Sequence, residues 1–156
     1  MKSRLLLTVA ALGMVLGIAG CTNTEDIGEW NFTVEIIGQD TYQFTNEDAA
    51  EIGPKDMVAA MKDGDNMLGE DTWRGILLYD LLDYYEVEDF AVISVEGADG
   101  SSTELDPTRI EAEKTGFAWM VNSETLDSEE GPIKFVNHNR GPKHWINQVT
   151  KITIIE

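Results

Sequence analysis

Residues 131–155 contain no aspartate or glutamate, although the chain of 156 residues carries 29 carboxylates and a formal charge of -18. Four of its 11 basic residues, Lys134, Arg140, Lys143 and Lys151, lie in this acid-free segment, together with both histidines. A cationic region inside a negatively charged protein attracts anions. We therefore expect an anionic ligand to bind at this part of the surface.

The acid-free segment also constrains the local fold. Ile133, Phe135 and Val136 form a short apolar run that is typical of a buried strand, and residues 149–155 form a second one. Residues 137–145 between them are rich in Asn, Gly and Pro, which predicts a loop. Loops between strands often carry binding groups, although an ordinary solvated connection is the alternative interpretation.

The rest of the composition indicates one globular domain. Hydrophobic residues make up 42% of the chain, with 4 Trp, 4 Tyr and 5 Phe, so a sizeable core is expected despite the charge. The strong negative charge disfavours nucleic acid and anionic membrane surfaces as partners.

The N-terminus has the pattern of an exported lipoprotein. Lys2 and Arg4 precede an apolar run, residues 5–18, that is too short and too glycine-interrupted for a comfortable membrane span. Small residues then lead directly to Cys21, as in the lipobox of secreted lipoproteins, where the cysteine is lipidated. We expect a signal peptide over 1–20, a lipidated tether over 21–29 and a domain over 30–156. The protein is then extracytoplasmic and membrane-anchored, in a periplasm or at the cell surface.

Cys21 is the only cysteine, so the expected domain has no thiol for a disulfide, a nucleophile or a metal.

Alternating apolar residues predict a hairpin over residues 30–44, and Thr45 with Asp48 predicts the capped start of a brief helix. Residues 57–61 fit either a strand or a helical turn, and 62–72 read as a loop. Further strands are expected over 90–95, 101–105 and 117–121.

Two more helices are expected. From Trp73 onward the apolar residues follow a helical period, and Asp106 followed by Pro107 has the pattern of a helix N-terminus. Short strands mixed with two or three helices predict an α+β mixed-sheet domain, not a doubly wound one.

Three landmarks stand in order along the chain: residues 72–78 with Trp73 and Gly75, the turn at Asp99 and Gly100, and the strand start at 131–136. Together they resemble the molybdopterin-binding domain of the sulfite oxidase family. That family has a Trp-x-Gly-Val-x-Leu segment, an Asp-Gly hairpin, a Gly-Pro strand and a late Trp, here Trp145. The resemblance covers roughly 32–155 and implies a sulfite oxidase-like fold with a pterin or molybdopterin as ligand.

The chain departs from the family in one decisive place. Catalytic members hold molybdenum through a cysteine thiolate in the region that corresponds to 57–72, and this chain has none there. Met or Lys cannot replace a soft thiolate without changing the metal chemistry. The position after Gly100 is Ser101, where the family often has an aromatic residue. The resemblance therefore favours the small exported members that bind a pterin without redox activity, with no metal expected.

The candidate site combines charge, amide groups and an aromatic ring. Arg and Lys side chains suit a phosphate, Asn side chains suit the edge of a pterin, and Trp suits its face. Arg74 enters because the family's loop faces the cofactor. The expected ligand-binding residues are Arg74, Asp99, Gly100, Asn137, His138, Asn139, Arg140, Lys143, His144 and Trp145.

Other candidates have simpler explanations. Trp73 is interpreted as a residue of the core in preference to a surface on which a ligand stacks. Arg109 is interpreted as the partner of Glu113 one helical turn away. Two histidines six residues apart, without a nearby carboxylate or thiol, make a poor metal site.

Three functions therefore remain open. The first is a non-catalytic binder of a pterin or another anionic heterocycle, and the second is a molybdopterin-dependent oxidoreductase. The third is a lipoprotein that uses the fold to hold a protein. The expected partners are a pterin-like small molecule, the membrane through the lipid anchor, and a membrane receptor or redox protein.

Overall fold

The computed structural model describes residues 27–156, which form two β-sheets with short helices beside them. The expected signal peptide, Cys21 and most of the tether lie outside the described residues. Within 27–156 no helix is long and apolar enough to cross a membrane.

The first sheet has the strand order β2-β1-β10-β5-β6. Its central pair, β1 and β10, is parallel, and its other neighbours are antiparallel, so the sheet is mixed. Its strands are β1 (Asn31–Ile36), β2 (Thr41–Thr45), β5 (Val92–Gly97), β6 (Ser102–Leu105) and β10 (Val149–Ile155).

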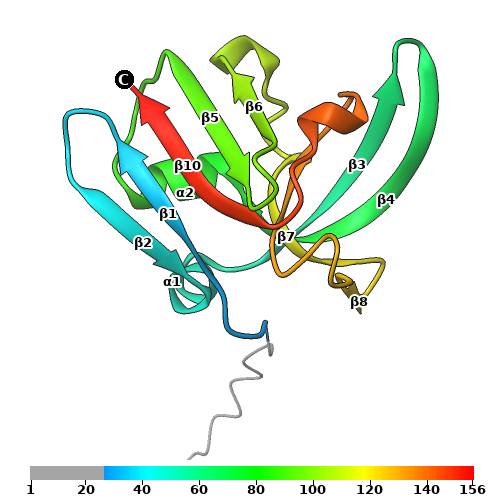
Figure 1. The fold of residues 1–156 in the computed structure, drawn as a ribbon, viewed down its shortest axis with the longest axis horizontal. Helices are drawn as coiled ribbons and strands as arrows, with labels where there is room; N and C mark the ends of the chain where they lie inside the picture. The colour runs from blue at the N-terminus through cyan, green and yellow to red at the C-terminus, as the bar shows by residue number, and fades with distance from the viewer. Residues whose placement is uncertain (1–26) are drawn as a thin grey trace, which may run out of the picture.

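The second sheet has the order β3-β4-β7-β8, and β9 also pairs with β7. All of its pairs are antiparallel. The long β3–β4 hairpin projects away from the rest of the molecule (Figure 1). The strands are β3 (Lys55–Asp63), β4 (Asn66–Leu77), β7 (Thr115–Val121), β8 (Glu124–Thr125) and β9 (Lys134–Asn137).

Two α-helices of seven residues each, α1 (Asn46–Ile52) and α2 (Leu78–Tyr84), flank the sheets. Helix α1 begins as the sequence predicts, because the Thr45 hydroxyl accepts from Asp48 N and the Asp48 carboxylate accepts from Thr45 N at 2.8 Å.

The expected α+β class is wrong, because strands dominate the described residues. The apolar periodicity after Trp73 predicts a helix, but residues 73–77 belong to β4. All five pair with β7, and residues 73–75 also pair with β3. Of the helix expected from Trp73 onward, only the part that forms α2 is helical. Residues 62–72, expected as a loop, mostly form the two arms of the β3–β4 hairpin. The helix expected after Asp106 is a single 3-10 turn, η1 (Pro107–Arg109).

Other elements are confirmed. The hairpin of β1 and β2, the strands β5, β6 and β7, and both strands of the acid-free segment, β9 and β10, lie where the alternation and the turn residues place them. In β1 and β10 the inward side chains are buried, as expected for alternating strands.

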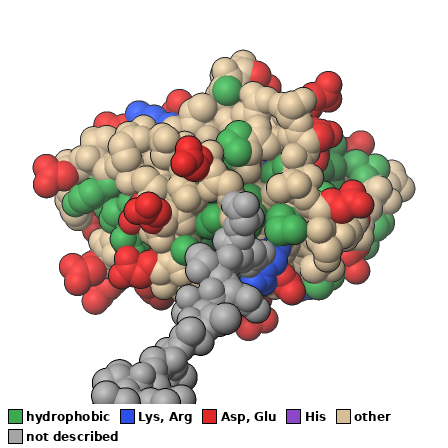
Figure 2. All heavy atoms as spheres, turned by 90° about the horizontal axis from the view of Figure 1, so that it is seen from below, with side chains coloured by type: hydrophobic (Ala, Val, Ile, Leu, Met, Phe, Trp, Pro, Cys, Tyr) green, Lys and Arg blue, Asp and Glu red, His purple; other side chains and the backbone are tan. Residues whose placement is uncertain are grey.

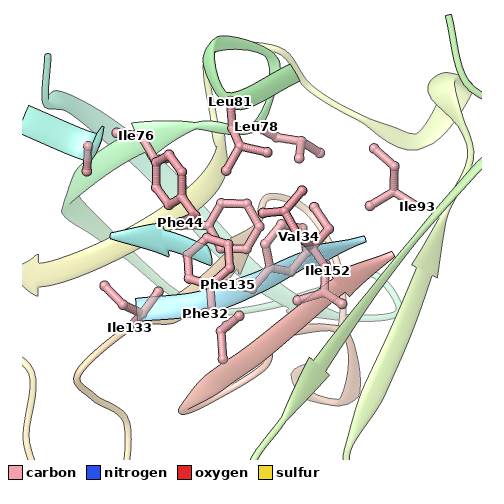
Figure 3. Packing of buried hydrophobic residues seen from close by; sticks show 14 of the residues in the cluster. Phe32, Val34, Phe44, Ile76, Leu78, Leu81, Ile93, Ile133, Phe135 and Ile152 are labelled. Carbon is pink, nitrogen blue, oxygen red and sulfur yellow. The ribbon is translucent and has the colours of Figure 1, made fainter. Parts of the chain in front are cut away.

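The main core lies between the sheets and α2. Phe32, Phe117 and Phe135 stack in a row with ring centroids 5.0 and 5.2 Å apart. Figure 3 shows Phe32 and Phe135 beside Val34 and Ile152, with Leu78 and Leu81 of α2 above them. Each large buried side chain of this kind contributes roughly 1.5–3 kcal/mol.

The structure shows why the Trp-x-Gly segment has a glycine at position 75. A Cβ built at this position lies 1.9 Å from the Phe117 carbonyl oxygen and 2.6 Å from Ala118 Cα, both on β7. The close approach coincides with a register shift between Arg74 and Gly75. Only glycine allows β4 and β7 to come this close.

Candidate functional site

The loop between β9 and β10 lies between the two sheets. Its 3-10 turn η2 (Pro142–His144) contacts β6 of the first sheet and β3 of the second, and Figure 1 shows the loop between these strands. The carboxylates are scattered over the surface that Figure 2 shows, which is a different face of the molecule. The position of the loop therefore gathers basic side chains from separate elements at one place.

Backbone hydrogen bonds fix the loop to β3. Asn139 N donates to Ala60 O at 2.8 Å, and Lys62 N donates to Arg140 O at 3.0 Å. The Trp145 indole nitrogen also donates to Arg140 O, at 3.2 Å. Asn139 has a positive φ of 57°, which an asparagine tolerates better than most residues. These contacts hold the loop through the main chain of Arg140 and not through its guanidinium.

Two adjoining hollows lie beside this loop, and Arg140 and His144 line both. The outer hollow has a volume of about 300 Å³, and the inner one, which reaches Asn137, about 30 Å³. We call the two together the cationic recess. Its charged lining residues are Lys62, Asp63, Glu104, Arg109, Arg140 and Lys143.

Four cations against two carboxylates make the cationic recess an exception in this acidic protein. Arg109 is held by Asp106, with 3.0 Å between Nε and Oδ2, and the Arg109 carbonyl accepts a long hydrogen bond of 3.4 Å from Arg140. Arginine and lysine side chains in such an arrangement bind phosphate and carboxylate groups.

His144 joins the cationic recess to the first sheet. Its Nδ1 lies 2.9 Å from the hydroxyl of Thr103 on β6. Burial, followed by the neighbouring charges of Lys143 and Arg140, lowers the pKa of His144. A neutral imidazole at physiological pH is therefore favoured, and it offers a hydrogen bond to a ligand without adding a charge.

Asn137 is 2% exposed at the end of β9, and its amide nitrogen donates to His144 O at 3.4 Å. Its Oδ1 is buried and has no hydrogen-bond partner among the described residues. An unpaired buried acceptor costs about 1–3 kcal/mol, so Asn137 is a group of the recess that a donor would stabilise.

His138 and Asn139 tie the loop to neighbouring elements, and Asn139 also lines the outer hollow of the recess. His138 is 6% exposed, and its Nδ1 accepts a hydrogen bond of 2.9 Å from Ala60 N. Glu111 binds both side chains, with 3.5 Å to His138 Nε2 and 2.9 Å to Asn139 Nδ2. These contacts position the loop, and neither residue's side chain needs a ligand to be satisfied.

Acidification is expected to weaken this support. Burial lowers the pKa of His138, so the folded state binds fewer protons than the unfolded chain, whose histidines titrate near pH 6.5. The resulting stability is present above about pH 6.5 and is lost as the pH falls below it. Protonated Nδ1 also cannot accept from Ala60.

Urea unfolding between pH 7.5 and pH 5.5 measures this effect. We expect the free energy of unfolding of the wild type to fall, and that of His138→Gln, which keeps an acceptor but does not titrate, to fall less. Identical slopes for the two proteins would contradict this role of His138.

The structure does not bring all the expected ligand residues together. Arg74 lies on β4, where its Nη1 is 3.0 Å from Asp56 on β3, and it does not line the cationic recess. Asp99 and Gly100 form the exposed tip of the β5–β6 turn, where the Asp99 carboxylate accepts from Ser101 N at 2.8 Å. Hydrogen bonds from the Ser101 side chain and then from its backbone lower the pKa of Asp99. A role for these three residues stays a prediction.

Trp145 is buried beneath the loop and lines a separate cavity with Trp73. Among the described residues, no Trp, Tyr or Phe lines the cationic recess.

The sequence reading missed Lys62, Thr103 and Arg109. Lys62 was assigned to a loop, and Arg109 was expected to pair with Glu113 on a helix that does not form. The local excess of basic residues indicates only the acid-free segment. Lys62, Thr103 and Arg109 lie far from it in sequence and reach the site through the pairing of distant strands.

The comparisons with known proteins identify a class of fold. No protein-family model matches the chain, and no curated protein matches it. Among solved structures, part of one protein has a similar fold. This protein is the sulfane dehydrogenase SoxCD from Paracoccus pantotrophus, with a TM-score of 0.64 and 16% identity. The match covers 81% of this chain and 38% of that chain, and at this identity it shows the fold alone. The likeness shows that this chain shares its fold with part of that protein.

Proposed function

We propose that the protein is an extracytoplasmic lipoprotein that binds a pterin or molybdopterin-like anion without catalysing a redox reaction. The observation that carries the proposal is the convergence of Lys62, Arg109, Arg140 and Lys143 on one recess of a chain with a net charge of -18. The sulfite oxidase-like sequence landmarks and the fold shared with part of a dehydrogenase support a pterin as the ligand class.

The residues present fit the organic part of such a ligand. Arg140 and Lys143 supply donors for a phosphate, and Asn137 and His144 supply groups for the polar edge of a heterocycle. They do not fit a thiolate-held molybdenum, since the only cysteine of the sequence is Cys21. These residues therefore suit recognition of a metal-free pterin through its phosphate and its polar edge.

Calorimetric titration of the purified protein with neopterin phosphate tests this function. Saturable binding that weakens with rising ionic strength is expected, because the cationic recess acts through charge. An absence of binding would exclude the pterin function and favour the third possibility, a scaffold that holds a protein.

A molybdopterin-dependent oxidoreductase is the second candidate, favoured by the dehydrogenase whose fold the chain shares. Elemental analysis separates it from the first. After expression in a host that makes the molybdenum cofactor, we expect far less than one molybdenum per chain, because residues 27–156 offer no thiolate. A value near one per chain, with sulfite-oxidising activity, would contradict the non-catalytic proposal.

Anchoring through Cys21 is a separate part of the proposal. Cys21→Ser is expected to shift the protein from the membrane fraction to the soluble fraction, because the lipid attaches to the sulfur. Fractionation after an alkaline wash measures the shift, and the wild type is the control. A variant that stays entirely with the membrane would show that another segment anchors the protein.

A further inference from the structure

A second cavity, with a volume of about 190 Å³, lies beside the β3–β4 hairpin. No residue lines both this cavity and the cationic recess. The loop between β9 and β10 contributes to both, with Arg140 and His144 lining the recess and Trp145 lining the cavity. We call the second space the aromatic cavity. Its walls include Trp73, Trp145, Lys134, Glu130, Met61 and Leu68.

The two indole rings form an aromatic corner. The ring centroids of Trp73 on β4 and Trp145 lie 5.5 Å apart, and the planes are inclined by 59°. The residues are 5% and 6% exposed. Such surfaces favour flat rings, which make face or edge contacts with indoles.

Lys134 places a charge in this aromatic setting. The residue is 5% exposed, and its ammonium lies 5.1 Å from the centroid of Trp73 and 5.9 Å from that of Trp145. It also forms an ion pair with Glu130. Burying a lysine is costly even when it is paired, and an apolar residue of similar size often packs as well. At the wall of a cavity, however, the pair presents both a hydrogen-bond donor and an acceptor.

Trp73 provides an independent indication. Its Nε1 is buried and has no hydrogen-bond partner among the described residues, whereas Trp145 Nε1 donates to Arg140 O. Buried indole N–H groups usually have a partner. Trp73 lines the cavity, so an acceptor on a bound ligand would satisfy this N–H once the indole shifts toward it.

We infer that the aromatic cavity binds a flat heteroaromatic ring that has both hydrogen-bond donors and acceptors on its edge. Trp73 and Trp145 contact the ring, while Lys134, Glu130 and Trp73 Nε1 bind its polar edge. The volume equals that of about six water molecules, which suits one small ring system and excludes a dinucleotide. The inference goes beyond the proposed function and rests on it only for the choice of pterin as the probe.

Calorimetric titration of the purified protein with unsubstituted pterin, which carries no phosphate, tests the inference. Trp73→Phe removes the N–H but keeps an aromatic ring, and Lys134→Met removes the charge but keeps the apolar stem. We expect each variant to bind pterin at least about tenfold more weakly, which corresponds to one lost hydrogen bond to a charged or buried group.

Trp119→Phe is the matched control. Trp119 is 2% exposed and its Nε1 is also buried without a partner among the described residues, but it does not line the aromatic cavity. The control should bind pterin as the wild type does. Urea unfolding of each variant shows whether it remains folded. No pterin binding by the wild type, unchanged binding by Trp73→Phe and Lys134→Met, or an equal loss in Trp119→Phe would overturn the inference.

Titration with pyrophosphate keeps the two sites distinguishable. Arg140→Ala should weaken pyrophosphate binding, whereas Trp73→Phe should leave it unchanged. If Arg140→Ala has no effect on pyrophosphate while the cavity variants lose pterin, the proposed recess fails and the aromatic cavity stands.

Discussion

Replacing Gly75 with alanine is expected to destabilise the protein by about 3 kcal/mol or more, a large fraction of the stability of a typical domain. The added Cβ would lie 1.9 Å from the Phe117 carbonyl oxygen, so β4 and β7 must separate. Backbone atoms cannot move aside as a flexible side chain can. The separation would also disturb Phe117, which is fully buried in the row of aromatic rings.

Gly69→Ala provides the matched control, because Gly69 lies on the same strand. Its added Cβ has one neighbour within 4 Å, Asp71 Oδ2 at 4.0 Å, and we expect a change within about 0.5 kcal/mol. Urea unfolding followed by circular dichroism measures both variants. Equal midpoints for Gly75→Ala and the wild type would show that β4 and β7 are not packed as closely as described.

Local signals in the sequence predicted the elements that local interactions determine. The Thr45–Asp48 capping box and the alternating residues of β1 are examples, and both have their expected conformation. The two strands of the acid-free segment were also found, because each is a short apolar run between turn residues.

The helix expected from Trp73 shows where local signals fail. Leu77, Leu78, Leu81 and Leu82 repeat at helical spacing, but pairing with β7 keeps the chain extended as far as Leu77, and β3 pairs with the same strand as far as Gly75. The hydrogen bonds of a strand with two neighbours outweigh a weak helical preference. This error, with the lost helix after Asp106, led to the wrong α+β class.

The sequence predicts only part of the candidate site, because some of its residues come together only through the fold. Arg140, Lys143 and His144 are close in sequence and lie together in the cationic recess, but Lys62 and Arg109 reach it only through the fold. Trp145, expected to stack on the same ligand, is buried under the loop beside Trp73. Closeness in sequence therefore identifies the residues of the loop that line the recess, but not those that other elements contribute.

Arg140→Ala is expected to weaken binding of neopterin phosphate by about 1.5–3 kcal/mol, which is roughly tenfold to 150-fold in Kd. Arg140 lines both hollows of the cationic recess, so its guanidinium is placed to bind a phosphate group. The loop keeps its position in the variant, because Lys62 N and the Trp145 indole both bind the Arg140 main-chain carbonyl. The loss of affinity in Arg140→Ala therefore measures the contribution of the guanidinium to ligand binding.

Lys151→Ala is the control for Arg140→Ala. A variant of Arg109 would not serve, because Arg109 lines the cationic recess itself. Lys151 belongs to the same acid-free segment and carries the same charge, so its loss changes the net charge equally. It lies on β10, pairs with Glu35 on β1 and does not line the recess. Long-range electrostatic effects are thus matched between the two variants.

Calorimetric titration of the wild type, Arg140→Ala and Lys151→Ala with neopterin phosphate at one ionic strength tests the central proposal most directly. We expect similar Kd values for the wild type and Lys151→Ala, and a Kd at least about tenfold higher for Arg140→Ala. Equal affinities for all three proteins, or no binding by the wild type, would contradict an anion site in the cationic recess.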